Sequence, residues 1–489
     1  MDRLSLRTLA RLAPEQRPRV DPRELKPRIL HFGLGAFHRA HQADYTEETA
    51  ARSGDGRGIV AVVPRQAGLA DQAAAQDGLF SLTTLAADAR PARVVGSVVE
   101  TLDMQRRGGA VDALMAAPEL ATVTITVTEK GYARRPRGGL DRSAPGIEQD
   151  LAATAGGGPM TTVVGRLASG LLERFRGSGA AIDLVSCDNT ADNGAALRGV
   201  LGDFVRASSW PERDALLEWF DSSVGCPDTV VDRIVPATTS ADLDVASNAL
   251  GLRDDLAVVG EPYRQWVLED AFRGDRPQWE LAGALFVDDV RPYQQTKLRL
   301  LNGAHSALAY LGLAAGRTTV TDVMATDWGE RLVRSLGDEV GPTIAGGPDK
   351  EEYAQALVTR FANPAVRHRL QQIGNDGSLK VGERWLPALR QLRTAGASTT
   401  TLELALAAWV NATRPSADSS SPRDPAALRF GTTDPAAAAL AACWGAGDLT
   451  TVVARLLRTI GADDVAEDPA IVDAITSRLP ALAAGRIEI

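Results

Sequence analysis

A short apolar run that ends in a glycine-rich turn constrains the fold of this chain more than any other stretch. In RILHFGLGAFHRAHQADYTEETAAR, the run from Ile29 to Phe32 meets Gly33 and Gly35 and then a polar segment compatible with a helix. A second apolar run, 58–63, begins about 25 residues later and has the β-branched content of a buried parallel strand. Strand, turn, helix and strand at this spacing predict a βαβ unit.

The rest of the chain extends this pattern and then changes it. Further β-rich runs at 93–99, 121–128 and 181–186 alternate with helix-compatible sequence, which predicts an α/β domain with a largely parallel sheet. After about residue 290 the sequence is rich in Ala and Leu with helical periodicity and almost no strand signal. We therefore predict a Rossmann-type dinucleotide-binding domain over residues 1–288 and a mostly α-helical substrate-binding domain over residues 289–489.

Composition excludes several classes of function. The 489 residues carry a net charge of -9 with acidic and basic side chains interspersed, so no basic stripe for nucleic acid is present. Cys187, Cys226 and Cys443 lie far apart without metal-ligand spacing, and no secretory leader is evident. No apolar run approaches the roughly 18 residues that span a bilayer. We expect a cytoplasmic protein without disulfides, a bound metal or membrane insertion.

The glycine turn is the first functional candidate. Gly33 and Gly35 occupy the first two positions of the dinucleotide fingerprint, whereas the third position is His38. A purely structural turn fits the same residues. At the end of the second strand, where an acidic residue would bind the ribose of NAD, the chain has Arg65. An arginine there holds a 2′-phosphate, which leaves NADP open, although a solvated loop charge is the alternative.

The stretch KLRLLNGAHSALAYLG places three polar side chains in an apolar helix. At 100° per residue, Lys297, Asn302 and His305 fall within one sector about 140° wide, so they can converge on one ligand. Taken singly, each has a structural alternative: Lys297 extends to solvent, Asn302 caps or kinks the helix, and His305 is a core histidine. Taken together after the turn Arg291-Pro292-Tyr293, they indicate a site.

These residues resemble the catalytic helix of the mannitol dehydrogenase family, the polyol-specific long-chain dehydrogenases. The resemblance covers nearly the whole chain. Its blocks, in order, are HFGLGAFHRAHQADYTE, VTEKGY, SCDNTADNG, VDRIVPAT, EPYRQWVLEDAF, RFANPAVRHR and DGSLK.

The resemblance implies a zinc-independent, NAD(P)-dependent oxidation of a secondary alcohol by a monomer with its site between two domains. Lys297 would be the general base, Asn302 and Asn193 would stabilise the oxyanion, and His305 would orient a substrate hydroxyl. Further substrate contacts would come from Asp232, Lys380 and Gln372. Cofactor contacts would come from Gly33, Gly35, Ala36, Phe37, Arg65 and Glu129. Without the resemblance, Asn193 reads as a turn residue, Asp232 as an ion-pair partner of Arg233, and Lys380 as solvated.

Three departures from the family pattern bear on function. Gln294 stands where the family has a glutamate proposed to release protons. Gln372 stands where mannitol-specific members have an arginine. A glutamine at this position resembles the fructuronate reductase (mannonate oxidoreductase) branch of the family. Gly68 stands where an acidic residue selects NAD. Our leading hypothesis is NAD(H)-dependent interconversion of D-mannonate and D-fructuronate. The alternatives are a mannitol 2-dehydrogenase, another polyol dehydrogenase, and, more distantly, a non-catalytic nucleotide-binding protein.

Overall fold

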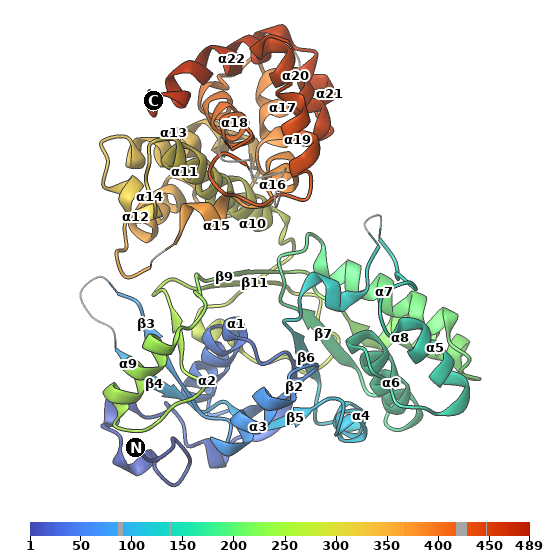
Figure 1. Cartoon of the computed structure of the whole chain (residues 1–489). Helices are drawn as coiled ribbons and strands as arrows, with labels where there is room; N and C mark the ends of the chain where they lie inside the picture. Colours follow the sequence, from blue (N-terminus) through green and yellow to red (C-terminus); the bar gives the residue numbers. More distant parts are fainter. Residues whose placement is uncertain (87–90, 136–137, 367, 417–427, 446) are drawn as a thin grey trace. The chain divides into compact units, whose positions relative to one another are not determined.

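The chain divides into two compact units, unit 1 over Met1–Val290 and unit 2 over Arg291–Ile489, each with its own cores (Figure 1). The computed structural model describes residues 1–86, 91–135, 138–366, 368–416, 428–445 and 447–489, without the side chains of Glu129 and Lys130.

A six-stranded parallel sheet forms the centre of unit 1. Its strands, in spatial order, are β5 (Val98–Asp103), β2 (Arg57–Val63), β1 (Lys26–Phe32), β6 (Thr122–Ile125), β7 (Ile182–Ser186) and β8 (Val224–Gly225). Neighbouring strands pair in parallel throughout. Numbered along the chain, this is the 3-2-1-4-5-6 order of the Rossmann fold, and its order reverses between β1 and β6. The carboxyl ends of β1, β2 and β6 therefore mark the place where such folds bind ligands.

Helices cover both faces of this sheet because its strands are buried on both sides. Leu30 and Phe32 of β1 enter one core, shared with α6 and α7, whereas Ile29 enters the other, shared with α2. The helices of unit 1 are α1 (Ala36–Ala40), α2 (Gln42–Ser53), α3 (Ala67–Ala75), α4 (Gly108–Ala116), α5 (Ile147–Gly156), α6 (Val163–Arg176), α7 (Asn193–Ala207), α8 (Arg213–Ser223) and α9 (Ser240–Leu250).

Two small sheets complete unit 1. One contains β10 (Val258–Gly260), β3 (Phe80–Thr84) and β4 (Ala92–Val95), and the other contains β12 (Leu285–Val287), β11 (Gln265–Glu269) and β9 (Thr229–Asp232). Strand β9 pairs antiparallel with β11. This pairing fixes the chain up to Asp232, which lies opposite Gln265 and is one of the residues expected in the site.

The prediction of a single strand at 93–99 is wrong. The chain forms two strands there, β4 and β5, which belong to different sheets. The break lies at Gly96-Ser97. The amide of Gly96 donates a hydrogen bond to the Glu47 carboxylate at 2.6 Å, and the Ser97 hydroxyl donates to the carbonyl oxygen of Ala43 at 2.7 Å. Contacts with α2 therefore redirect the chain in the middle of a continuous β-rich run. The other expected strands are present, although β6 ends at Ile125 rather than at residue 128.

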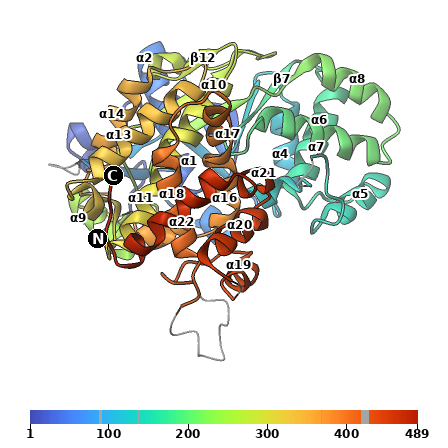
Figure 2. The ribbon, with the colours of Figure 1, turned by 90° about the horizontal axis from the view of Figure 1, so that it is seen from above.

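Unit 2 is a helical bundle, in agreement with the sequence. Its helices are α10 (Arg291–Thr296), α11 (Gly303–Ala314), α12 (Val320–Met324), α13 (Gly329–Val340), α14 (Lys350–Phe361), α15 (Leu370–Gly374), α16 (Gly377–Arg384), α17 (Leu386–Thr394), α18 (Thr400–Ala412), α19 (Ala437–Cys443), α20 (Leu449–Thr459), α21 (Asp463–Ala466) and α22 (Pro469–Ala483). Helix α18 packs between α11 and α22 and is almost wholly buried (Figure 2).

The predicted class, a Rossmann-type α/β domain followed by a helical domain, is confirmed. Among the helices formed by the described residues, none has both the length and the apolar character needed to cross a bilayer.

Candidate functional site

The glycine turn follows β1 and leads into α1. Gly33 has a φ of 108°, and a Cβ added to it would lie 2.8 Å from the carbonyl oxygen of Thr126, so only glycine fits this place. A Cβ on Gly35, by contrast, would point into open space with no atom within 4 Å. Gly33 thus allows the tight turn, and Gly35 leaves the backbone open to the close approach of a pyrophosphate. The residues present fit a dinucleotide.

A histidine stack replaces the third glycine of the fingerprint. His38 of α1 lies against His31 of β1 with ring centroids 3.4 Å apart and an interplanar angle of 16°. His31 is hydrogen-bonded through both ring nitrogens, to the hydroxyls of Thr124 and Thr126. Burial lowers the pKa of His31 to about 3, so both rings are neutral near pH 7. In this chain, α1 therefore packs closely on β1 through two flat, stacked imidazole rings, where the fingerprint has a glycine without a side chain. The next turn residues, Ala36 and Phe37, are half-buried.

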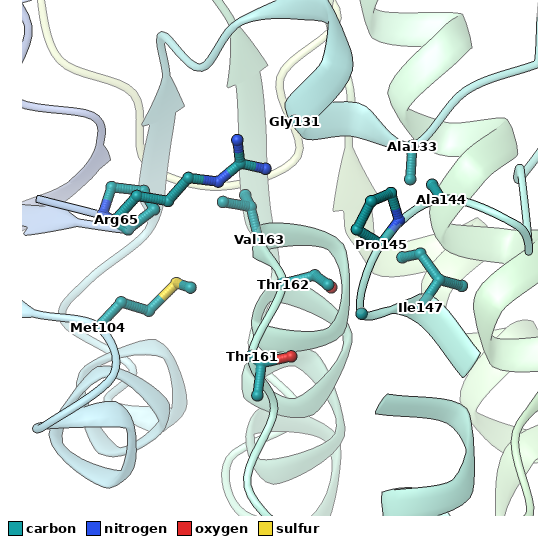
Figure 3. A pocket seen from close by; sticks show the side chains of 12 residues that line it. Arg65, Met104, Gly131, Ala133, Ala144, Pro145, Ile147, Thr161, Thr162 and Val163 are labelled. Atoms are coloured by element: carbon teal, nitrogen blue, oxygen red, sulfur yellow. The ribbon is translucent and has the colours of Figure 1, made fainter. Parts of the chain in front are cut away.

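Unit 1 also contains a cavity of about 380 Å³, which lies at the carboxyl ends of β2 and β5 (Figure 3). Most of its lining side chains are apolar, with Met104, Ile147 and Val163 among those that face it (Figure 3). Arg65 follows β2 and extends its guanidinium across the cavity, toward the segment that contains Gly131 (Figure 3). This is the side of the sheet where a Rossmann fold holds the adenosine part of its ligand. Glu129, expected to contact the cofactor, begins the short 3-10 turn Glu129–Tyr132, but its side chain lies outside the described part of the structure.

Asn193 is the first residue of α7 and is only 2% exposed. Its Nδ2 donates to the carbonyl oxygen of Ser186 at 3.2 Å and to the hydroxyl of Thr229 at 3.1 Å, while its Oδ1 accepts from the amide of Thr229 at 2.9 Å. The amide thus links the ends of β7 and the start of β9. Asp232 ends β9 and is also buried. The next residue, Arg233, pairs with Asp44 of α2.

In unit 2, the stretch expected to be one α-helix contains a π-helical turn, Lys297–Asn302, between α10 and α11. The amide of Gly303 donates to the carbonyl oxygen of Leu298, five residues back, instead of to that of residue 299. The 100° spacing assumed from the sequence is therefore wrong over this turn, because a wider turn rotates each residue by a smaller angle. Lys297 and Asn302 lie at its two ends and are half-buried, and His305 lies buried within α11.

Two side chains from further along the chain donate hydrogen bonds where the π-helical turn joins α11. The guanidinium of Arg384 donates to the carbonyl oxygen of Asn302 at 3.1 Å and to the hydroxyl of Ser306 at 2.6 Å. The indole of Trp385 donates to the carbonyl oxygen of Gly303 at 3.2 Å. Neither residue was expected in the site, and no motif or spacing in the sequence connects them with Lys297.

The surroundings of His305 are cationic. Its ring centroid lies 4.5 Å from that of Phe361 and 5.2 Å from that of His368. Its Nε2 is buried and has no hydrogen-bond partner among the described residues. Burial, and then the neighbouring His368, Arg360 and Arg384, hold the pKa of His305 well below its usual range. A neutral imidazole with one unused nitrogen therefore lies within a positive electrostatic field.

The other expected substrate residues of unit 2 lie on α15 and α16. Lys380 donates from Nζ to the carbonyl oxygens of Asn375 at 2.6 Å and Ile373 at 3.2 Å. Burial, and then Arg384, lower the pKa of Lys380. Gln372 is exposed on α15. Gln294, on α10, has a buried amide nitrogen without a hydrogen-bond partner in the described part of the chain.

The expected site residues thus form two groups. Unit 1 contains the glycine turn, Arg65, Asn193 and Asp232, and unit 2 contains Lys297, Asn302 and His305 with Lys380 and Gln372. Groups of three or more His, Cys, Asp or Glu side chains that could hold a metal ion are not found among the residues described.

Comparison with known proteins identifies both units. The family described as "Mannitol dehydrogenase Rossmann domain" matches residues 27–281, and the "Mannitol dehydrogenase C-terminal domain" matches residues 289–483. The chain is 37% identical to the D-mannonate oxidoreductase of Escherichia coli (strain K12) over 410 residues, which cover 82% of this chain and 83% of the relative.

Two solved structures are similar over nearly the full length. The mannitol 2-dehydrogenase of Pseudomonas fluorescens, solved as a ternary complex with NAD and D-mannitol, is 33% identical with a TM-score of 0.79, and the match covers 98% of this chain and 96% of that one. A D-sorbitol dehydrogenase in substrate-free form is 26% identical with a TM-score of 0.87, and the match covers 99% of this chain and 100% of that one.

Proposed function

Because the chain belongs to the mannitol dehydrogenase family and is a dehydrogenase of secondary alcohols, we propose that it interconverts D-mannonate and D-fructuronate with a nicotinamide dinucleotide. Because it belongs to this family, the chain acts on a polyol or a sugar acid. The choice of a sugar acid is our proposal.

The cationic surroundings of His305 carry this choice. Arg360 and Arg384 both contribute to the electrostatic field at His305 and depress the pKa of its ring. A carboxylate bound in this region would gain from the field, whereas a neutral polyol would not. Gln372, which takes the place of an arginine in mannitol-specific members, supports the same choice. So does the 37% identity to the D-mannonate oxidoreductase.

The proposed roles follow from the chemistry of each side chain. A bound dinucleotide supplies the hydride acceptor for oxidation and the donor for reduction. Lys297 takes the proton of the reacting hydroxyl at Nζ and returns it in the reverse direction. The Asn302 amide donates a hydrogen bond to the oxygen as it gains negative charge. His305, with its unused Nε2, orients a neighbouring hydroxyl of the substrate.

Asn193 is proposed as the second amide donor to the same oxygen. Its two amide hydrogens are already directed at internal acceptors in unit 1, so donation to a substrate requires one of these bonds to be exchanged. Its other role, holding β7 to β9, does not depend on the substrate. An Asn193→Ala variant that loses stability as well as kcat would agree with both roles.

One kinetic comparison decides the substrate. Initial rates of dinucleotide oxidation are measured with D-fructuronate and with D-fructose at equal concentrations, using NADH and NADPH in parallel. A preference for D-fructuronate supports the sugar-acid proposal. A preference for D-fructose would replace it with mannitol 2-dehydrogenase activity, and the 33% identity to such an enzyme keeps this alternative in view. Activity with neither substrate would indicate another polyol or a non-catalytic protein.

The role of Lys297 is tested separately. Lys297→Ala should lower kcat by orders of magnitude while dinucleotide binding, followed by protein fluorescence, persists. Lys297→Arg keeps the positive charge but has no readily lost proton, so it should be equally inactive. If Lys297→Arg retains most of the wild-type kcat, the lysine acts through its charge and the general-base assignment is wrong. Lys26→Ala, at an exposed position of β1, serves as the control and should leave kcat unchanged.

A further inference from the structure

Among the described residues that line the cavity of unit 1, Arg65 is the one with a polar side chain free to bind a ligand. Of its twelve lining residues, only Arg65, Thr161 and Thr162 have side chains with nitrogen or oxygen atoms. Both threonine hydroxyls donate to the buried carboxylate of Asp150, at 2.8 Å and 2.7 Å. Arg65 is exposed and makes no hydrogen bond or ion pair with any described residue. Among the described lining residues, Arg65 is therefore the one that can bind a charged group of a ligand inside this cavity.

The backbone that presents Arg65 is fixed in place. The side chain of Gln105, which follows β5, donates from Nε2 to the carbonyl oxygen of Pro64 at 3.2 Å and to that of Thr161 at 2.9 Å. This bridge ties the residue before Arg65 to the start of α6. The guanidinium is thus attached to a braced part of unit 1, at the rim of the cavity (Figure 3).

Among the side chains that the structure describes, no carboxylate pairs with Arg65. Between the end of β2 and Asp71, the chain has no acidic residue, and a Cβ on Gly68 would meet no atom within 4 Å. Asp71 itself pairs with Arg106 at 3.0 Å, and Arg106 also lies 3.4 Å from Asp103. The carboxylate of Asp150 is turned toward the amides and hydroxyls of Thr161 and Thr162. Among the described side chains that line the cavity, the charged one is therefore that of Arg65, and the segment after β2 lacks the acidic acceptor that binds the ribose 2′-hydroxyl of NAD.

We propose that Arg65 is a specificity-determining residue that binds the 2′-phosphate of the dinucleotide, so that this chain binds NADP(H) more tightly than NAD(H). The apolar wall around Met104, Ile147 and Val163 takes the adenine ring, and the guanidinium takes the phosphate on the adjoining ribose. This proposal rests on dinucleotide binding by unit 1, not on the identity of the sugar substrate.

The test uses fragments that carry only the adenosine half of the cofactor. Binding of 2′,5′-ADP and of 5′-AMP to the full-length protein is measured by isothermal titration calorimetry. A charged arginine–phosphate contact predicts that 2′,5′-ADP binds about tenfold more tightly or better. Arg65→Gln should remove that preference and leave binding of 5′-AMP within about twofold of wild type. Arg106→Gln, at an arginine paired with Asp71 outside the cavity lining, is the matched control and should keep the preference.

Equal binding of the two fragments to the wild-type protein, or a preference that survives in Arg65→Gln, would overturn the proposal. Failure of both fragments to bind would overturn the assignment of the cavity itself. Steady-state kinetics give a second readout, since Arg65→Gln should raise the KM for NADPH while the kcat is nearly unchanged. Because the fragments contain no nicotinamide, a preference for 2′,5′-ADP would stand even if D-fructuronate proved not to be the substrate.

Discussion

A single carboxylate in unit 1 holds together a cluster of arginines, and its removal should be severely destabilising. Asp44 of α2 has a side chain that is only 8% exposed. Its carboxylate oxygens lie close to four guanidinium groups, namely those of Arg93 at 2.6 Å, Arg264 at 2.8 Å, Arg233 at 3.1 Å and Arg19 at 3.4 Å. We consider the variant Asp44→Asn, which keeps the shape of the side chain and removes its charge.

The size of the stability loss depends on which ion-pair partners each arginine keeps when the Asp44 carboxylate is removed. Arg93 still pairs with Glu47, and Arg19 and Arg264 still pair with Glu48. Arg233 has a side chain only 3% exposed; Asp44 is an acidic side chain that pairs with it, and its other hydrogen bonds go to the carbonyl oxygens of Ala40 and Glu261. Breaking a buried pair by removing one member costs about 3–5 kcal/mol, because the remaining charge is left buried without compensation. We therefore expect Asp44→Asn to lower the free energy of unfolding of unit 1 by about 3 kcal/mol or more.

Urea unfolding at pH 7.5, followed by circular dichroism, measures this loss. Asp71→Asn is the matched control: its carboxylate is 63% exposed and also pairs with an arginine, so it should cost less than about 1 kcal/mol. The double variant Asp44→Asn with Arg233→Met should regain much of the lost stability, since it removes the stranded charge. The reasoning is refuted if Asp44→Asn costs no more than Asp71→Asn, or if the added Arg233→Met substitution recovers nothing.

Three other perturbations test further features. All five histidines have lowered pKa values, first of all through burial, so the unfolded chain takes up protons below about pH 6.5 that the folded chain does not. The free energy of unfolding, measured by urea titration, should fall between pH 7.5 and 5.5 by up to about 1.4 kcal/mol per histidine. The fall should be smaller in His41→Gln, which has one such histidine fewer. Equal free energies of unfolding at the two pH values would contradict this. Gly194→Ala would place a Cβ 2.3 Å from the carbonyl oxygen of Cys226 and displace Asn193, so kcat/KM should drop at least about tenfold. Gly199→Ala, where a Cβ on the same helix meets nothing within 4 Å, should leave kcat/KM unchanged, and an equal loss in both variants would count against the explanation. Burial raises the pKa of the half-buried Cys226 thiol to about 12, so an aromatic disulfide reagent at pH 8 should label it much more slowly before urea is added than after, and equally rapid labelling of the folded protein would contradict this.

The features that were predictable from the sequence depend on neighbours along the chain. The glycine turn and the first βαβ unit could be predicted because Gly33, Gly35 and the apolar runs are local signals for a turn and for buried strands. The division between β4 and β5 was not predictable. It depends on Glu47 and Ala43, about 50 residues earlier, which bind Gly96 and Ser97 and redirect the chain. A β-rich run alone does not reveal that it changes sheets.

The candidate site shows the same limit. Lys297, Asn302 and His305 could be identified because polar residues stand out in an apolar helix. The π-helical turn could not be predicted, and the carbonyl oxygens at its junction with α11 accept hydrogen bonds from Arg384 and Trp385, 82 positions further along the chain in each case. His368, whose ring lies beside that of His305, carries no signal of its own in the sequence. The partners of a site residue are thus harder to find than the residue itself.

The π-helical turn separates two requirements that a continuous α-helix would couple. Helix α11 must present Ala304, Leu308 and Leu311 to the core of unit 2, and this requirement fixes its rotation about its own axis. Without the turn, the same rotation would also dictate where Lys297 points. With the turn, the direction of the lysine is set by a separate segment, held by its own hydrogen bonds. Substitutions that repack the bundle and rotate α11 can then leave the direction of the Lys297 side chain unchanged.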